Sequence, residues 1–195
     1  MNKNVHSKQE IINNSNEVQN INSSDHINLL NFDQILRVLK SQSDTEKANY
    51  LMREIRNRIS KKKYYKLKNI TLYSIMYYDI FGIRNENNNS ISNLLKNEEY
   101  LIPYNRTSLE AMKLLNAIAN EKVGRSYLLM KNQLVEEIVK IMMKEEGDTE
   151  KRQCSLGIIQ KFTLRSEPQK HLIDLDVIMW ITSILISVSA FKFRS

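Results

Sequence analysis

The fold of this chain is decided by residues 114–141, which read LLNAIANEKVGRSYLLMKNQLVEEIVKI. About 44 residues later the same order of apolar and polar positions returns in residues 158–185, IIQKFTLRSEPQKHLIDLDVIMWITSIL. Matching positions of the two copies are Leu115 and Ile159, Ile118 and Phe162, Gly124 and Pro168, Leu128 and Leu172, Leu134 and Ile178, and Ile141 and Leu185. Apolar residues recur every three or four positions, which is typical of helices with one buried face.

A repeat of this length predicts the class of fold. Units of roughly 44 residues with two or three helices have the size of armadillo and HEAT repeats. Such units cannot bury their apolar faces alone, so they stack into a solenoid with an extended binding surface. We therefore predict an all-α protein, an α-solenoid of armadillo-like repeats. The second copy has no visible cap after it, so we expect a truncated solenoid with an incomplete last repeat.

The composition supports a helical fold. The chain has 195 residues, of which 42% are hydrophobic, enough to form a core. Four Gly and two Pro are few, as expected for helices with short connections. The single Cys154 excludes a disulfide within the chain and is typical of a reducing compartment. We expect its thiol to lie in the core.

The chain divides into three parts by composition. Residues 1–27 are rich in Asn, Ser and Gln, with too few apolar side chains to offset the entropy of ordering, so we predict a disordered tail without a signal peptide. Residues 28–106 form a predicted helical lead-in segment, and residues 107–195 form the armadillo-like repeats.

Local signals place the ends of several helices. Asn31 is a predicted N-cap, and the segments Ser43–Glu46 and Thr107–Glu110 have the spacing of a capping box. A third lead-in helix is predicted over residues 64–80, with Gly82 as its C-terminal stop. No hairpin or strand-pair signal accompanies these helices.

The repeats also predict a core and an apolar C-terminal helix. We expect these side chains to be buried: Leu115, Ile118, Leu128, Leu134, Ile138, Phe162 and Trp180. The run Val177–Phe191 contains no charged residue, so it is either a buried last helix or a membrane anchor. Its fifteen residues fall short of the roughly 20 that span a bilayer. A buried helix whose outer face packs on a neighbour is therefore favoured.

Several strings in the repeats resemble one known family. Residues 114–119 (LLNAIA), 124–128 (GRSYL) and 160–165 (QKFTLR), with the Trp180 segment, resemble the armadillo region of the LisH-domain-containing ciliary armadillo family, armadillo-repeat-containing protein nine. The resemblance is good over residues 107–180. It continues more weakly upstream through Leu30-Asn31-Phe32-Asp33, so that it covers about 150 residues in all.

The resemblance implies a non-enzymatic scaffold. Members of that family are associated with cilia, basal bodies and centrioles, where they act in cilium assembly and stability. The implied partners are ciliary or centriolar proteins, including tubulin and microtubule proteins with TOG domains. The family has a LisH motif far upstream, of which residues 1–60 show nothing, and it continues through further repeats beyond the equivalent of Ser195. We therefore expect this chain to hold a part of the family's repeat region.

One strongly basic stretch is the candidate binding site. The net charge of the chain is +7. The whole excess lies between residues 53 and 68, where Glu54 is the one acid among eight basic residues: Arg53, Arg56, Arg58, Lys61, Lys62, Lys63, Lys66 and Lys68. Such a cluster can bind a polyanion, and the resemblance suggests acidic tubulin tails. Nucleic acid is not expected, since no nucleic-acid-binding motif is present. A solvated helix end in a Lys-rich chain is the alternative.

No residue pattern indicates catalysis, a cofactor or a metal site. His6, His26 and His171 are scattered, and no Cys or His spacing suits a metal. Glu136-Glu137 and Glu145-Glu146 are adjacent pairs, which do not face each other on a helix. Neither the helix at residues 134–143 nor that at 177–185 contains Asn, so recognition of extended peptides by an Asn ladder is not expected, and Asn116 in an earlier helix is expected to be structural. A membrane-tethered adaptor and a polyanion binder are the alternatives to the scaffold.

Overall fold

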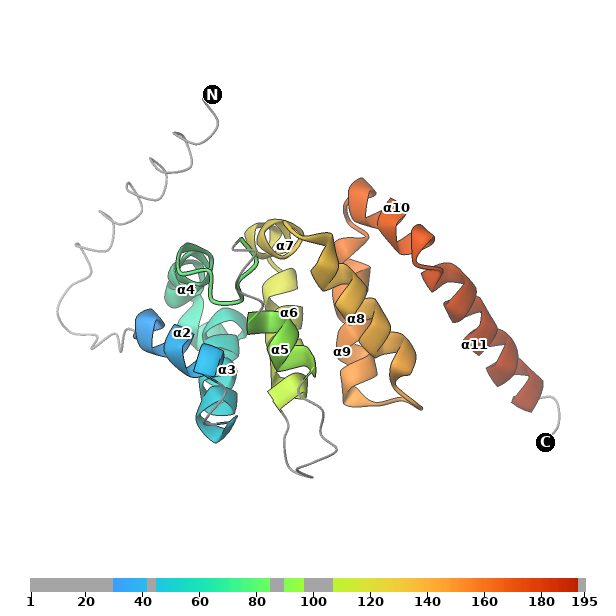
Figure 1. The fold of residues 1–195 in the computed structure, drawn as a ribbon, viewed down its shortest axis with the longest axis horizontal. Coiled ribbons are helices and arrows are strands. Elements are labelled where there is room, and N and C mark those ends of the chain that lie inside the picture. The colour runs from blue at the N-terminus through green and yellow to red at the C-terminus, as the bar shows by residue number, and fades with distance from the viewer. Residues whose placement is uncertain (1–29, 42–44, 85–89, 97–106, 193–195) are drawn as a thin grey trace. The chain divides into compact units, whose positions relative to one another are not determined.

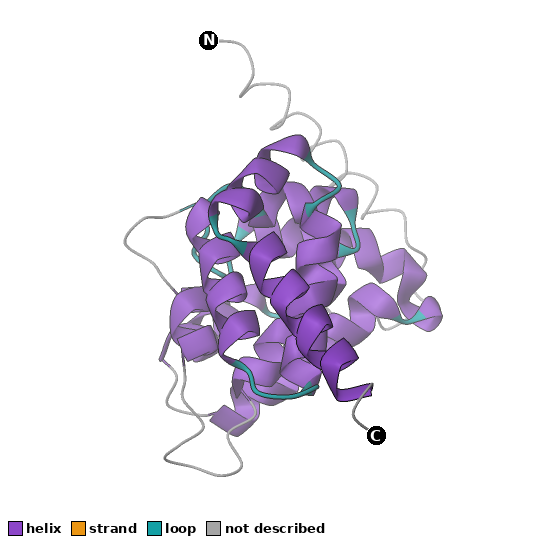
Figure 2. Cartoon of the chain, turned by 90° about the vertical axis from the view of Figure 1, so that its right-hand side faces the viewer, coloured by secondary structure: helices purple, strands orange, loops and turns teal. Residues whose placement is uncertain are grey.

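The computed structural model describes residues 30–41, 45–84, 90–96 and 107–192. Within these ranges all regular structure is helical and no strand occurs (Figures 1 and 2). The prediction of an all-α protein is therefore confirmed. The predicted tail, residues 1–27, lies outside the described residues, as does Ser43 of the first capping box. The helices from residue 31 onward belong to one unit.

The helices are labelled as in Figure 1. They are α2 (Phe32–Ser41), α3 (Thr45–Ser60), the short 3-10 helix η2 (Lys62–Tyr64), α4 (Tyr65–Tyr77), α5 (Ser90–Lys96), α6 (Thr107–Ala119), α7 (Lys122–Leu128), α8 (Asn132–Lys144), α9 (Glu150–Phe162), α10 (Ser166–Asp174) and α11 (Val177–Lys192).

Side chains near the helix ends satisfy backbone donors that the helices leave open. Asn31 Oδ1 accepts a hydrogen bond of 3.0 Å from the amide of Gln34, so the predicted N-cap of α2 is confirmed. Thr149 caps α9 in the same way, accepting from the amide of Arg152 at 3.1 Å. The predicted end of α4 is wrong: the helix ends at Tyr77, and the first residue after it with a left-handed conformation is Asp79, with a φ of 45°. Gly82, the predicted stop, has a φ of 66° but lies three residues beyond Asp79.

The repeat seen in the sequence is visible in the order of helices. Helices α6, α7 and α8 have 13, 7 and 13 residues, and α9, α10 and α11 have 13, 9 and 16. Each copy is therefore long, short, long. Equivalent positions are buried in both copies through the first two helices: Leu115 and Ile159, Ile118 and Phe162, Gly124 and Pro168, and Leu128 and Leu172.

Helices α3, α6 and α9 lie side by side, with α6 in the middle (Figure 1). Helix α6 has neighbours on both sides, so it buries ten of its 13 residues, among them Met112, Leu114 and Leu115. Helix α8 packs along α9, and α5 packs on α6. The hydrophobic effect of this central row is the main source of stability of the unit.

Two expectations about the C-terminal helix are wrong. Six of the seven predicted core residues are buried, but Trp180 is only half-buried, under the guanidinium of Arg152 at 5.4 Å from the ring centre. The run beginning at Val177 is the helix α11, but it is not a buried one. Ile178 is 58% exposed, although its counterpart Leu134 is 3% exposed. The reason is packing, because α11 contacts mainly α10, whereas α8 also has α9 along its side.

Helix α11 has 16 residues. None of the helices in the described ranges combines the length and the apolar character needed to cross a membrane.

Candidate interaction surface: a polar groove and a lysine corner

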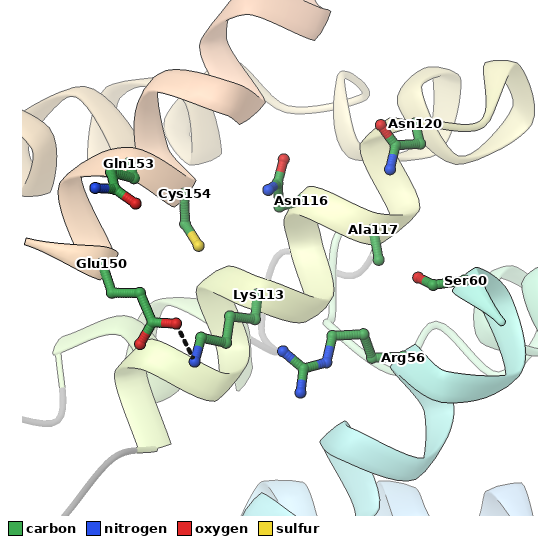
Figure 3. Close-up of a pocket in the computed structure, with 9 residues that line it drawn as sticks. All are labelled: Arg56, Ser60, Lys113, Asn116, Ala117, Asn120, Glu150, Gln153 and Cys154. Carbon is green, nitrogen blue, oxygen red and sulfur yellow. Dashed lines mark ion pairs between the residues drawn. The ribbon is translucent and has the colours of Figure 1, made fainter.

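A polar groove runs between α3, α6 and α9 (Figure 3). Its volume is about 440 Å³. The lining side chains are polar or charged apart from Ala117 and Cys154, and they come from α3 (Arg56, Ser60), from α6 and its end (Lys113, Asn116, Ala117, Asn120) and from α9 (Glu150, Gln153, Cys154). The groove therefore exists only because three segments that are far apart in the sequence stack side by side.

Ion pairs across the groove hold the three helices together. Lys113 Nζ lies 2.7 Å from Glu150 Oε1, which joins α6 to α9 (Figure 3). On the other side, Arg56 Nη2 lies 3.5 Å from Glu110 Oε2, which joins α3 to α6. The acids neutralise these two cations, so the middle of the groove has polar walls with little excess charge.

Asn116 holds α9 against α6. The ammonium of Lys161 donates to Asn116 Oδ1 and lies 3.4 Å from the Asn116 carbonyl oxygen. A Cβ on Gly157 would lie 3.1 Å from Asn116 Oδ1, so glycine permits this close approach. Partial burial lowers the pKa of Lys161 below its ordinary value. The structural role expected for Asn116 is thus confirmed for its side-chain oxygen.

Cys154 lies in the wall of the groove. The side chain is half-buried, so the expectation of a core thiol is wrong. Burial raises its pKa, and this effect exceeds the opposing effect of the nearby Lys113. The thiol therefore stays protonated at neutral pH, a state in which cysteine is a poor nucleophile.

Half of the predicted basic stretch is occupied by ion pairs within the fold. Arg53 and Arg56 both approach Glu110, Arg58 is buried and pairs with Glu54 at 3.4 Å, and Lys68 pairs with Glu121 at 2.6 Å. Arg53 and Arg56 connect α3 to α6, Lys68 connects α4 to Glu121 just before α7, and Arg58 pairs within α3. Three carboxylates compensate their charge, and two of these, Glu110 and Glu121, lie far from this stretch in the sequence.

The other half forms an exposed cluster, here called the lysine corner, made of Lys61, Lys62, Lys63 and Lys66. These side chains lie at the turn from α3 to α4, and no carboxylate of the described residues forms an ion pair with them. Lys63 Nζ lies 4.6 Å from the centre of the Tyr64 ring. Four exposed cations at one turn give this corner a positive electrostatic potential.

The lysine corner adjoins one end of the groove. Ser60 lines the groove and directly precedes Lys61 in the chain. Asn120, at the end of α6, lines the same end of the groove (Figure 3), and the ion pair of Lys68 with Glu121 ties α4 to that end. Helices α3 and α6 both end here, and the negative ends of their dipoles favour nearby cations.

The groove itself was not predicted from the sequence. A signal was present, since Lys113, Asn116 and Asn120 stand at helical spacing along the mainly apolar second half of α6 and just after its end. Its partners on α3 and α9 could not be found in this way, because their proximity depends on the stacking of helices.

Side chains that could bind a metal ion are not clustered in the described part of the chain. Within the described ranges, no three or more His, Cys, Asp or Glu side chains are grouped so that they could hold a metal ion. His171 lies 3.5 Å from Glu136 across α10 and α8, an arrangement that connects two helices.

The fold and the site together define an all-helical protein whose notable surface features are a polar groove and a cluster of lysines. Its sequence is similar to LisH domain-containing protein ARMC9 from several vertebrates. The protein from Xenopus laevis is 27% identical over 153 residues, which cover 78% of this chain and 18% of the relative. Those from Bos taurus and Homo sapiens are 24% identical over 156 residues, 80% of this chain and 23% and 18% of the relatives, respectively.

The predicted resemblance is thereby confirmed, as a weak match that is consistent across the relatives. The chain spans about a fifth of the length of these curated relatives. No protein-family model matches the sequence, and no solved structure matches the chain.

Proposed function

We propose that this chain is a non-enzymatic protein-interaction module built of armadillo-like helical repeats. The observation that carries the proposal is the similarity to ARMC9 over four-fifths of the chain. It is supported by the long, short, long order of helices in two consecutive units and by the row of α3, α6 and α9. Stacked helical units expose long continuous faces, which suit the binding of other proteins.

The module is proposed to act in cilium assembly or stability, at the cilium and basal body, with ciliary or centriolar proteins as partners. The family resemblance supports this role. The test is to tag the endogenous protein and locate it by microscopy together with a basal-body marker. Enrichment at basal bodies or along cilia is expected, whereas an even distribution through the cytoplasm would count against the ciliary role.

The lysine corner is proposed to contact an acidic polypeptide, with tubulin tails as the candidate. Lys61, Lys62, Lys63 and Lys66 are exposed on long flexible side chains, so they can follow an extended acidic chain without a shaped pocket. An exposed ion pair contributes about 0.5 kcal/mol, so four contribute about 2 kcal/mol, or roughly 30-fold in affinity. Attraction of this kind weakens as salt shortens the Debye length.

Microtubule co-pelleting at about 50 mM and about 300 mM salt tests the lysine corner. The variant with all four lysines changed to Glu should lose most pelleting at low salt. A matched control changes four scattered exposed lysines to Glu, Lys40, Lys122, Lys140 and Lys170, which alters the net charge equally. Equal pelleting by the two variants, or undiminished binding to microtubules whose acidic tails have been removed, would refute the assignment.

A further inference from the structure

The polar groove between α3, α6 and α9 contains hydrogen-bonding groups that the fold does not use. Asn116 Oδ1 accepts from Lys161, but the NH2 group of the same amide forms no hydrogen bond to another described residue. The side chain of Asn120 also forms none, and Gln153 uses Nε2 on Asp148, so its Oε1 stays open. Figure 3 shows these side chains, from two segments of the chain, around the same groove.

These carboxamide groups favour a polypeptide main chain as the ligand. A carboxamide has an NH2 donor and a carbonyl acceptor, which match the carbonyl and the N–H group of a peptide unit. An apolar ligand would leave the carboxamides without partners, at a cost in free energy. A helical ligand has already paired most of its own main-chain groups, whereas an extended segment has them available. The groove therefore suits an extended segment.

The row of three helices sets the length of that segment. Packed helices lie about 8–10 Å apart, so the row of α3, α6 and α9 spans roughly 16–20 Å. An extended chain advances about 3.3 Å per residue, so about five or six residues cross the groove. So few main-chain contacts barely offset the entropy lost on binding. The segment therefore needs a second anchor outside the groove.

The charges around the groove place that anchor at its α3 end. On the α9 side, Lys113 is paired with Glu150 at 2.7 Å, and Asp148 accepts from Gln153 at 3.0 Å. At the other end, Ser60 leads directly into the lysine corner. Acidic residues of a ligand are therefore attracted at the α3 end and not at the α9 end.

The expectation that extended peptides are not bound concerned other helices. It was drawn from the absence of Asn in residues 134–143 and 177–185. These segments belong to α8 and α11, neither of which lines the groove. Asn116 and Asn120 do line it, and they lie on α6 and just after its end.

We propose that the groove binds the main chain of an extended segment of another protein, about six uncharged residues long, and that adjoining acidic residues of that protein contact the lysine corner. Asn116, Asn120 and Gln153 hydrogen-bond the peptide units, and the lysine corner supplies the second anchor. The proposal rests on the proposed binding of an acidic polypeptide by the lysine corner, and it adds the groove as the part that recognises main chain.

Two fluorescent peptides separate the groove from the lysine corner in anisotropy titrations with the full chain. One is hexaglutamate, and the other is hexaglutamate flanked on both sides by (Gly-Ser)3, so that either chain direction can enter the groove. The flanked peptide should bind about tenfold more tightly, because it adds hydrogen bonds in the groove. The same peptide with sarcosine in place of Gly lacks half of the flanking N–H groups and should lose most of this advantage.

The double variant Asn120→Leu/Gln153→Leu removes two of the proposed contacts with little change in side-chain size. It should bind the flanked peptide about tenfold more weakly and hexaglutamate like the wild type. The matched control Asn132→Leu/Gln160→Leu alters the same residue types at exposed positions outside the groove and should bind both peptides normally. Cys154, the single cysteine, lies in the groove wall, so the flanked peptide should slow its reaction with a thiol reagent, whereas hexaglutamate should not.

Two results would overturn the proposal. One is equal affinity of the wild type for the flanked peptide and for hexaglutamate. The other is a flanked peptide that binds the double variant as tightly as the wild type, or that leaves Cys154 equally reactive. Failure of the lysine corner is distinguishable, because changing its four lysines to Glu would then leave the affinity for hexaglutamate unchanged. In that case the proposal fails together with the assignment on which it rests.

Discussion

Phe162 provides the sharpest test of how the second copy packs onto the first. Its side chain is fully buried at the end of α9, a helix that packs against both α6 and α8. Phe162→Ala removes the ring and leaves a cavity, because neighbours fastened by ion pairs such as Lys113 with Glu150 can relax only in part.

The expected loss in the free energy of unfolding is about 3–5 kcal/mol. For a chain of this size that corresponds to a fall in Tm of roughly 6–20 °C, at about 2–4 °C per kcal/mol. In urea, with a slope near 2.5 kcal/mol/M, the midpoint should fall by about 1.5 M and the slope should stay constant. The loss is a large part of the about 5–15 kcal/mol that a domain possesses.

The matched control is Leu164→Ala, two residues further along the chain. Leu164 is 67% exposed, so its truncation should change stability by no more than about 0.5 kcal/mol. Thermal melts and urea titrations followed by circular dichroism measure both variants. If Phe162→Ala and Leu164→Ala have the same Tm and the same urea midpoint, α9 is not packed as described. The groove and the α8–α9 interface would then be wrong as well, because both depend on the position of α9.

Three further predictions follow from the same packing. Gly124→Ala should destabilise the chain by about 1–3 kcal/mol in urea titrations, because the new Cβ would collide with the backbone carbonyl oxygen of Ile118 and lie 2.7 Å from its Cγ2. Tyr127→Phe removes the 2.7 Å hydrogen bond to Asp79 Oδ1 and should cost about 1–2 kcal/mol. Burial, and then the hydrogen bond to Asp79, raise the pKa of Tyr127 in the folded state. The contribution of Tyr127 to the free energy of unfolding should therefore be full below about pH 10 and fall above it. In Tyr127→Phe the loss of stability at alkaline pH should be smaller, and an equal loss in both proteins would contradict the assignment. Cys154 should react with a thiol reagent at pH 7 more slowly than free cysteine, and unfolding in urea should abolish the difference.

The helices and their ends could be predicted because their determinants are local. Asn31 caps α2, and the order of helices in the two copies matches the repeated pattern of apolar residues. The end of α4 was missed, because the left-handed residue after that helix is Asp79 and not Gly82. Caps, stops and helical periodicity act within one or two turns, so the sequence displays them directly.

The basic stretch shows that ion pairs between distant residues could not be predicted from local sequence patterns. The sequence reading treated eight cations as one surface, whereas Arg53 and Arg56 approach Glu110 and Lys68 pairs with Glu121. Glu110 and Glu121 are more than fifty positions away from their partners in the chain. Long-range pairing of this kind depends on how α3 and α4 stack on α6. Arg53 stays exposed but approaches Glu110, whereas the four lysines of the lysine corner are exposed without an ion pair to a carboxylate of the described residues.

The sequence by itself determined that this protein is all-α, that a unit of helices occurs twice, and that its apolar stripes form a core, because these properties depend on the period of side chains along each helix. The tertiary structure decided which faces of those helices are covered. It placed α3, α6 and α9 in a row with a polar groove between them, paired half of the cations, and left Ile178 exposed where Leu134 is buried. Burial depends on the neighbour that a helix meets in space, and two helices with similar apolar patterns differ when only one of them has that neighbour.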